Sequence, residues 1–253
     1  MTKNNSKVQA LYDHCNNTFT PSTSPSPQAS QSICSLLDTL GPADVGLKVE
    51  LSDDDLEHGN FGINQLDRAE RRAQPITYLE VYKCHSSTMC IFCLPTSAVF
   101  PLHNHPEMTV FSKVLYGSVH VKAYDWVEPA QIQETKGPSS FPVRLAKLSA
   151  DKVLTAPCEA TVLYPKSGGN LHCLTAVTPC AVLDILSPPY REEPGRKYSY
   201  YHDYPYSTFS AGNRAFIETP DGKEEDYAWL AAIETPDDLN ICDGKYAGPA
   251  IEL

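Results

Sequence analysis

The pattern of hydrophobic and polar residues divides the chain near residue 75. Before that point, residues 6–16 are predicted to form a short helix, and residues 30–40 carry apolar side chains at helical spacing. A Gly-Pro pair follows the second stretch and is expected to end its helix. Residues 19–31, FTPSTSPSPQASQ, are rich in proline and serine, so we expect a flexible linker there.

Beyond residue 75 the pattern is typical of β-strands. Short runs rich in β-branched and aromatic residues follow one another with tight turns between them. These runs span residues 76–84, 88–95, 98–103, 108–117, 118–126, 143–150, 152–157, 160–165, 171–178 and 180–188. Many short strands of this kind predict a sandwich or a barrel. Continuous apolar runs such as AVLDILS are expected where a strand is covered on both faces.

Polar stretches before and between these strands are expected to lie on the surface. They are the acidic residues 51–62 and the interval at residues 127–141. The tail from residue 189 is aromatic and polar, and we expect it to form an ordered flank or the mouth of a binding site. Residues 226–233 are predicted to add one last short helix or strand.

The composition supports one large domain. Hydrophobic residues make up 42% of the 253 positions, which is enough for one sizeable core, and the sequence has no internal repeat. We therefore expect a helical N-terminal extension with its linker over residues 1–45 and one domain over residues 46–253. The formal net charge of −11 argues against direct binding to nucleic acid or to an anionic membrane. We expect a monomer.

The nine cysteines are scattered along the chain. The polar start has no signal-peptide pattern and no apolar run reaches membrane-spanning length, so we expect free thiols in a reducing compartment and no membrane association. Cys90 and Cys93 have the spacing of half a zinc or redox motif, but no second pair complements them. We interpret both as buried thiols of a strand.

Histidines provide the candidate chemistry. His103 and His105 are two residues apart in a strand-like run, so both rings should project to one face. His172 follows Gly168-Gly169, where a turn could bring the next strand close. The three histidines predict a metal site, because neutral imidazole binds iron, zinc, copper or nickel. No ligand-like partners accompany the remaining histidines, which are His14, His58, His85, His120 and His202.

These motifs resemble those of the cupin superfamily. The first cupin motif places a glycine where Gly117 stands, and the second has the Gly-x-x-His spacing of Gly169 and His172. The glutamate of the first motif is absent, because its position falls on Thr109 or Val110. The resemblance implies an all-β fold, a cupin double-stranded β-helix (jelly-roll) barrel with a short helical N-terminal extension.

The missing glutamate changes the expected chemistry. Three neutral histidines leave an iron(II) site with a charge of +2, whereas two histidines and a carboxylate would leave it near +1. The higher charge favours an anionic thiolate as a ligand. Three ligands on one face also leave coordination positions for a substrate and for O₂.

Two longer stretches carry a closer resemblance. PLHNHPEMTVFSKVLYGSVHVKAYDW and LYPKSGGNLHCLTAVTPCAVLDILSPPY, together with LGPADVGL, are similar to the plant cysteine oxidases, relatives of the animal aminoethanethiol dioxygenase. The similarity runs from about Val8 to the end of the chain. It implies a dioxygenase that uses Fe(2+) and O₂ to oxidise the N-terminal cysteine of a protein to cysteine sulfinic acid.

The resemblance also implies a biological setting. In plants the substrates are group VII ethylene response transcription factors. Their oxidation leads to arginylation and to degradation by the N-degron pathway, which makes the enzyme an oxygen sensor of the hypoxia response. We accordingly expect the protein in the cytoplasm and nucleus.

Individual positions follow from the same resemblance. His103, His105 and His172 match the iron ligands, and Asp184 matches a carboxylate near the iron that is expected to hold the substrate's α-amine, directly or through water. Tyr190 matches a tyrosine near the active site, where it either orients the substrate and oxygen or is a plain part of the wall. The animal relative has a Cys two residues before a Tyr in its C-terminal flank. Here the sequence reads Tyr-Ser-Tyr at 198–200, so we expect no Cys–Tyr crosslink.

Two other functions remain open. A small-thiol dioxygenase would take cysteamine or free cysteine, and the latter needs an arginine for its carboxylate; Arg144 is the only candidate in the central strands. A cupin without a metal would be a non-catalytic binding module, against which the complete set of three histidines argues.

Overall fold

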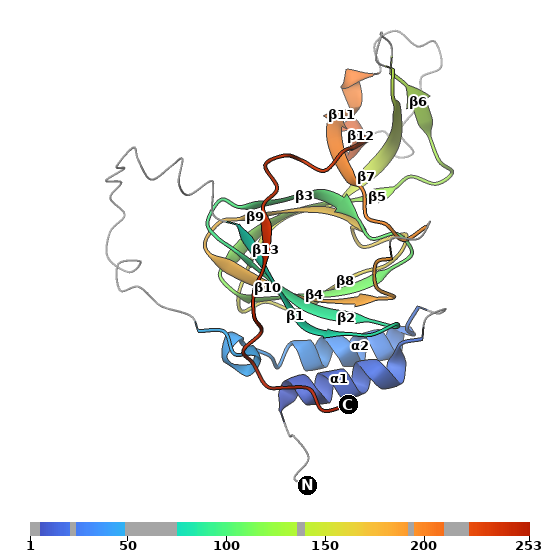
Figure 1. Cartoon of the computed structure of the whole chain (residues 1–253). Coiled ribbons are helices and arrows are strands. Elements are labelled where there is room, and N and C mark those ends of the chain that lie inside the picture. Colours follow the sequence, from blue (N-terminus) through green and yellow to red (C-terminus); the bar gives the residue numbers. More distant parts are fainter. Residues whose placement is uncertain (1–5, 21–23, 49–74, 136–139, 192–194, 210–222) are drawn as a thin grey trace, which may run out of the picture.

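The computed structural model describes residues 6–20, 24–48, 75–135, 140–191, 195–209 and 223–253 (Figure 1). Its helices are α1 (Lys7–Thr18) and α2 (Pro27–Leu37), with short 3-10 turns η1 (Pro42–Val45), η3 (Tyr206–Thr208) and η4 (Glu224–Asp226). Its strands are β1 (Ile76–Lys83), β2 (Thr88–Leu94), β3 (Val99–Asn104), β4 (Thr109–Tyr116), β5 (Ser118–Trp126), β6 (Ile132–Glu134), β7 (Pro142–Thr155), β8 (Thr161–Leu163), β9 (Leu171–Ala176), β10 (Cys180–Ser187), β11 (Tyr200–Pro205), β12 (Tyr227–Ile233) and β13 (Ile241–Asp243).

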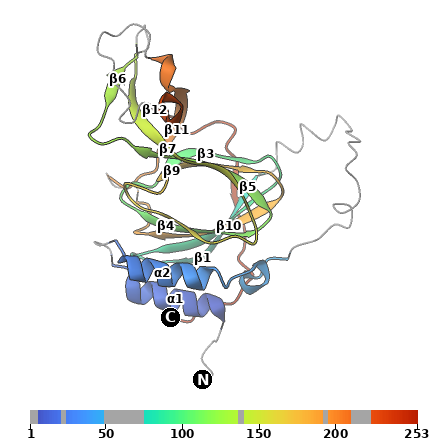
Figure 2. The same ribbon diagram turned by 180° about the vertical axis from the view of Figure 1, so that it is seen from behind.

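The strands form a jelly-roll barrel. One sheet has the order β13-β1-β2-β10-β4-β8, and the facing sheet has the order β12-β11-β3-β9-β5-β7-β6. From β2 to β5 and from β7 to β10, the chain passes from one sheet to the other and back at each successive strand. The central strands of the two sheets are β2-β10-β4-β8 and β3-β9-β5-β7. This is the strand order of two wound Greek keys, so the predicted double-stranded β-helix is confirmed. Figures 1 and 2 show the barrel from opposite sides.

Strand β10 is covered on both of its faces. All eight of its residues are buried. Ala181, Leu183 and Ile185 pack in one cluster with the apolar faces of α1 and α2, whereas Val182 and Leu186 belong to clusters inside the barrel. Successive side chains of a strand point to opposite faces. The AVLDILS run is therefore buried on both of its faces because helices cover the outer face of its sheet, as the figures show.

The N-terminal segment differs from the prediction at one boundary. The expected linker, residues 19–31, is helical from Pro27 onward. The Ser26 hydroxyl accepts a hydrogen bond from the Ala29 N–H at 3.2 Å, and Pro27 occupies the first helical turn. Serine followed by proline is a helix start signal as well as a linker signal, so the prediction of a linker was wrong over residues 27–31.

Several β-segments also differ from the prediction. The two strands expected over 143–150 and 152–157 are one strand, β7, because its ladder with β5 continues through a single register shift. The interval expected to be a surface loop contains β6, and the tail expected to be an ordered flank contains β11 and β13. β11 and β12 pair with each other, and β12 also pairs with β7, which extends one sheet beyond the barrel. The acidic stretch 51–62 lies outside the described residues.

All nine cysteines lie in the described residues, and all are free thiols. Cys90 is buried inside the barrel at 1% exposure, and Cys93 packs in the cluster beneath the helices. The interpretation of both as strand thiols is confirmed, whereas the expected burial holds for Cys90 alone, because Cys93 is only partly buried. Among the described residues, no helix has the length and hydropathy needed to cross a membrane.

The apolar contact between α2 and the barrel gives a test of stability. Leu37 is fully buried beneath the outer face of the barrel. We expect Leu37→Ala to lower the free energy of unfolding by about 2–5 kcal/mol, because it leaves a cavity in this cluster. Urea denaturation measures the loss. Leu36→Ala, a partly buried neighbour on the same helix, should cost clearly less; equal losses would show that α2 does not pack through Leu37.

Candidate metal centre

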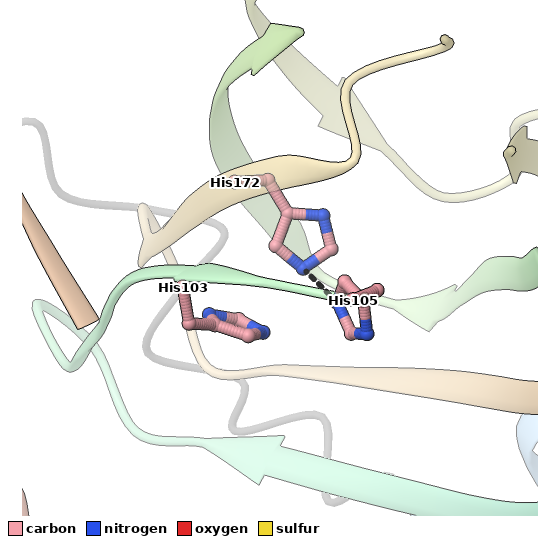
Figure 3. A group of neighbouring side chains, drawn as sticks. All are labelled: His103, His105 and His172. Carbon is pink, nitrogen blue, oxygen red and sulfur yellow. Dashed lines mark hydrogen bonds between the residues drawn. The ribbon is translucent and has the colours of Figure 1, made fainter. Parts of the chain in front are cut away.

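Three histidines meet inside the barrel. His103 lies in β3, His105 follows the end of β3, and His172 lies in β9. All three are buried, and one ring nitrogen of each lies within 4.8 Å of those of the others. Figure 3 shows the rings of His105 and His172 facing each other, with His103 beside them. The structure thus brings together all three histidines predicted from the sequence.

A β-bulge sets the direction of His103. Phe100 is paired with Leu174, and His103 is paired with His172, so three steps along β3 match two steps along β9. In a regular ladder Leu102 would oppose His172 and His103 would point to the other face. The extra residue re-aims His103 toward the interior, as bulges near functional sites often do. Pro101 lies within this irregular segment, where its lack of an N–H is tolerated.

Burial keeps the three rings neutral. It lowers the pKa of His103 to about 4 and holds those of His105 and His172 well below the usual range. Each ring therefore offers a lone pair at neutral pH. The Nε2 atoms of His105 and His172 are 3.3 Å apart, the separation expected of two nitrogens that each lie about 2.1 Å from one metal ion. Two lone pairs at this distance require a proton or a cation between them, so the donor set fits a metal.

Hydrogen bonds fix which nitrogen of the His103 and His105 rings faces the centre. His103 Nδ1 lies 2.8 Å from the carbonyl oxygen of Pro101, to which only an Nδ1–H can donate. His105 Nδ1 lies 2.6 Å from the hydroxyl of Tyr190, which is also 2.9 Å from the carbonyl oxygen of Asn104. The consistent arrangement is that His105 donates to Tyr190 and Tyr190 donates to Asn104. Both histidines then present Nε2 to the metal position.

This geometry specifies how Tyr190 belongs to the site. Its hydroxyl is engaged by His105 and the backbone, and its ring forms part of the cavity wall. Burial is the largest cause that raises the pKa of Tyr190 well above its usual value, so the hydroxyl stays protonated. Tyr190 can therefore orient a histidine without carrying charge.

Asn170 was missed in the sequence. Its side-chain amide donates to the carbonyl oxygen of His105 at 2.9 Å and accepts from the His105 N–H at 3.2 Å. The Asp125 carboxylate in turn accepts from the backbone N–H groups of Gly169 and Asn170 at 2.9–3.0 Å. Gly169 has φ +87°, and a Cβ there would lie 2.6 Å from that of Ala123. The Gly-Gly-Asn run before His172 was the available signal.

Asp184 reaches the same cavity from the opposite sheet. Its side chain is 4% exposed, and its Oδ1 has no hydrogen-bond partner among the described residues. Burial raises the pKa of Asp184 to about 6, although a hydrogen bond with Ser112 opposes the shift. A buried carboxylate oxygen that lacks a hydrogen-bond partner is costly. The Oδ1 atom of Asp184 therefore has the capacity to accept a hydrogen bond inside the cavity.

The cavity that joins these groups has a volume of about 210 Å³. Its walls are mostly apolar and aromatic, with Phe92, Phe100, Leu174 and Leu186 around the histidines. Tyr198 and Ile241 lie at its exposed margin. The small size and apolar walls suit a short side chain and restrict water near the histidines.

Other predicted residues lie elsewhere. His120 forms an exposed hydrogen bond with Asp151 at 2.7 Å, and His58 lies outside the described residues. Cys173 packs in a separate apolar cluster. Arg144 pairs with Glu128 at 2.7 Å and stacks on Trp126, and it does not line the cavity. It is thus not placed to hold the carboxylate of free cysteine in this cavity.

Comparison with known proteins agrees with this geometry. The chain is 43% identical to plant cysteine oxidase 2 of Arabidopsis thaliana, over 97% of the chain and 83% of that protein. It is 40% identical to plant cysteine oxidase 1, over 97% of the chain and 80% of that protein. The family model PCO_ADO matches residues 36–251. The chain belongs to this family.

Membership of the PCO_ADO family establishes the class of reaction. The mouse 2-aminoethanethiol dioxygenase is also similar, with 30% identity over 72% of the chain and 73% of that protein. The named relatives are thiol dioxygenases, and so is this enzyme. The family is metal-dependent, and the three-histidine cluster fits its metal site.

The contact between Tyr190 and His105 predicts a change in metal affinity. Tyr190→Phe removes the hydroxyl that accepts from Nδ1, so the ring loses its fixed orientation. We expect cobalt(II) to bind roughly 10- to 100-fold more weakly, measured by competition with a chelator. Tyr198→Phe, which alters a second tyrosine of the same cavity, should bind cobalt normally. Equal cobalt affinity in the wild type and in both variants would show that the Tyr190 hydroxyl does not support His105 as a metal ligand.

Asn170 gives a separate prediction. The Asn170 amide donates to the carbonyl oxygens of His105 and Tyr164. Asn170→Asp replaces this donor with an oxygen that would face both carbonyl groups, and it should displace the backbone of His105. We expect the rise in melting temperature caused by cobalt(II) to shrink, beyond any loss in the metal-free protein. The exposed substitution Asn16→Asp is the control. If metal-free and metal-bound proteins lose the same stability, Asn170 has only a structural role.

Proposed function

We propose that this enzyme binds iron(II) at His103, His105 and His172 and oxidises the N-terminal cysteine of proteins to cysteine sulfinic acid. The observation that carries the proposal is the set of three buried neutral histidines, without a carboxylate among them, beneath a small cavity. When bound, iron(II) supplies the activation of O₂. Both oxygen atoms end on the sulfur, which is the composition of a sulfinate.

The donor set supports a thiol substrate. Neutral ligands leave the full charge of a divalent ion uncompensated, and a thiolate is the anion that a substrate cysteine can provide. The apolar walls strengthen this attraction because they exclude water from the site. Positioning of the thiolate and O₂ at one centre makes their reaction effectively unimolecular.

Asp184 supports the recognition of the α-amine. An N-terminal cysteine carries an ammonium group two carbons from its sulfur, and Asp184 offers a buried carboxylate that lacks a partner on Oδ1. A charge-assisted hydrogen bond would satisfy both groups. A cysteine inside a protein chain has no such ammonium, which gives a physical basis for selection of chain termini.

The candidate substrates share one chemical unit. 2-Aminoethanethiol has the same neighbouring amine and thiol as an N-terminal cysteine, so it is the second candidate. The exposed margin at Tyr198 and Ile241 favours a peptide, because the chain that follows the cysteine needs an exit. The higher identity to the two plant cysteine oxidases supports the same choice.

The wider role is part of the same proposal. The substrates would be group VII ethylene response transcription factors, whose oxidised N-terminus enters the N-degron pathway, and the enzyme would act as an oxygen sensor in the hypoxia response. It would work as a monomer in the cytoplasm and nucleus, without direct contact with nucleic acid or membranes. The net charge of −11 supports the last point.

A labelled-oxygen assay tests the reaction. The enzyme is loaded with iron(II) under anaerobic conditions and mixed with a Cys-initiated peptide and ¹⁸O₂. We expect a mass gain of two labelled oxygen atoms on the cysteine. The same peptide with an acetylated N-terminus should react poorly. If the peptide is unchanged while 2-aminoethanethiol is oxidised, the small-thiol function replaces the proposed one.

Asp184 predicts a pH dependence. Its raised pKa, about 6, means that the carboxylate form grows as the pH rises through this value. If the carboxylate binds the ammonium, kcat/KM for the peptide should rise over the same interval. The Asp184→Asn variant should lack this rise of kcat/KM with pH, and its kcat/KM should be roughly 10- to 100-fold lower. The variant should still bind iron. A wild-type profile in the Asn variant would make Asp184 a structural residue.

A further inference from the structure

The mouth of the cavity lies between the margins of the two sheets. Among the lining residues, Tyr198 and Ile241 are the most exposed, at 44% and 39%. Ile241 begins β13, the edge strand of one sheet, and Tyr198 immediately precedes β11 of the other sheet. In Figure 1 the segment that contains β13 runs from the sheet extension past the barrel toward the helices. Any molecule that enters the cavity here passes Ile241, the first residue of β13.

Among the described residues, strand β13 pairs with a neighbouring strand on one side only. It pairs in parallel with β1, with Ile241 opposite Ile76 and Asp243 opposite Tyr78. The Ile76 N–H donates to the carbonyl oxygen of Asn240 at 2.9 Å, and the Gly244 N–H donates to that of Tyr78 at 2.8 Å. In a parallel ladder the alternate residues of a strand bond to the same neighbour.

The backbone groups of Ile241 and Asp243 therefore point away from β1. Within the described part of the chain, β13 has no strand on this second side. Unpaired N–H and C=O groups at a sheet edge are a template for another extended segment. The Ile241 side chain faces the cavity, so this template begins where the cavity ends.

We propose that the substrate residues that follow the N-terminal cysteine pair their backbone with the free edge of β13. The inference rests on the proposed function, because it takes the cysteine to be the group held in the cavity. With its thiol at the histidines and its amine at Asp184, the cysteine directs its carbonyl group and the following chain toward the mouth. Recognition of the backbone would allow different side chains after the cysteine.

A pair of variants separates the backbone from the side chain. Asp243→Pro and Asp243→Ala both remove the carboxylate, but only proline removes the outward N–H. Proline is tolerated at an edge position whose N–H points away from the sheet. We expect kcat/KM for a Cys-initiated peptide to be about fivefold lower in the Pro variant than in the Ala variant. For cysteine amide, which has no following residue, the two variants should be equal.

A second measurement uses the unaltered enzyme and so does not depend on the folding of a variant. Cys-initiated peptides are methylated on one backbone nitrogen at a time, at successive positions after the cysteine. Strand pairing predicts that methylation lowers kcat/KM at alternate positions. A uniform response to methylation, together with equal activity of the Pro and Ala variants, would overturn the inference while leaving the proposed function intact. Failure to oxidise the unmodified peptide would instead refute both.

Discussion

The site depends on the register between β3 and β9. The bulge between Phe100 and His103 places His103 directly opposite His172, and His105 follows at the end of the same strand. Without the extra residue, His103 would point out of the barrel, and His105, two residues further along the same segment, would turn away with it. Pairing of two neighbouring strands thus brings residues that are far apart in sequence to one point. The carbonyl oxygen of Pro101, inside the bulge, also orients the His103 ring.

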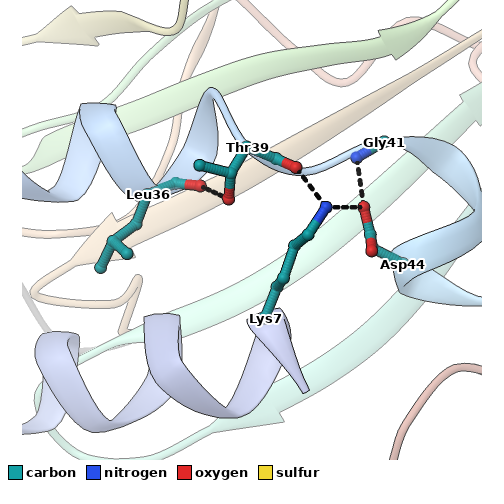
Figure 4. Close-up of polar contacts among 5 residues, drawn as sticks. All are labelled: Lys7, Leu36, Thr39, Gly41 and Asp44. Atoms are coloured by element: carbon teal, nitrogen blue, oxygen red, sulfur yellow. Dashed lines mark hydrogen bonds and ion pairs between the residues drawn. The ribbon is translucent and has the colours of Figure 1, made fainter. Parts of the chain in front are cut away.

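The facing sheet, which completes the cavity, is supported from outside. Helices α1 and α2 cover the outer face of the sheet that carries Asp184. The turn after α2 is tied to α1 by Lys7, which donates to the carbonyl oxygen of Thr39 at 2.7 Å and to Asp44 at 2.9 Å (Figure 4). The Gly41 N–H and the Lys7 ammonium lower the pKa of Asp44, so the ion pair persists at neutral pH. With its outer face covered, β10 can turn one carboxylate inward among apolar residues.

The sequence predicts features that arise locally. The strand runs, the His-x-His pair and the Gly-x-x-His spacing each need only a few neighbouring residues, and they led to the barrel and to the three histidines. The strands β11 and β13 could not be predicted in this way, because their partners are distant along the chain and β13 is only three residues long. The hydrogen bonds between the Asn170 amide and the backbone of His105 also join residues that are 65 positions apart in the sequence. Tyr190 was found by resemblance, but its bond to His105 required the fold.

We propose that the three histidines hold the iron on which oxidation depends. Metal analysis of protein purified without oxygen, together with its His172→Ala variant, tests this role. We expect one iron per wild-type chain, and loss of both iron and peptide oxidation in a variant that keeps its fold by circular dichroism. A variant that retains full iron and full turnover, or a wild-type enzyme that oxidises the peptide without any metal, would contradict it.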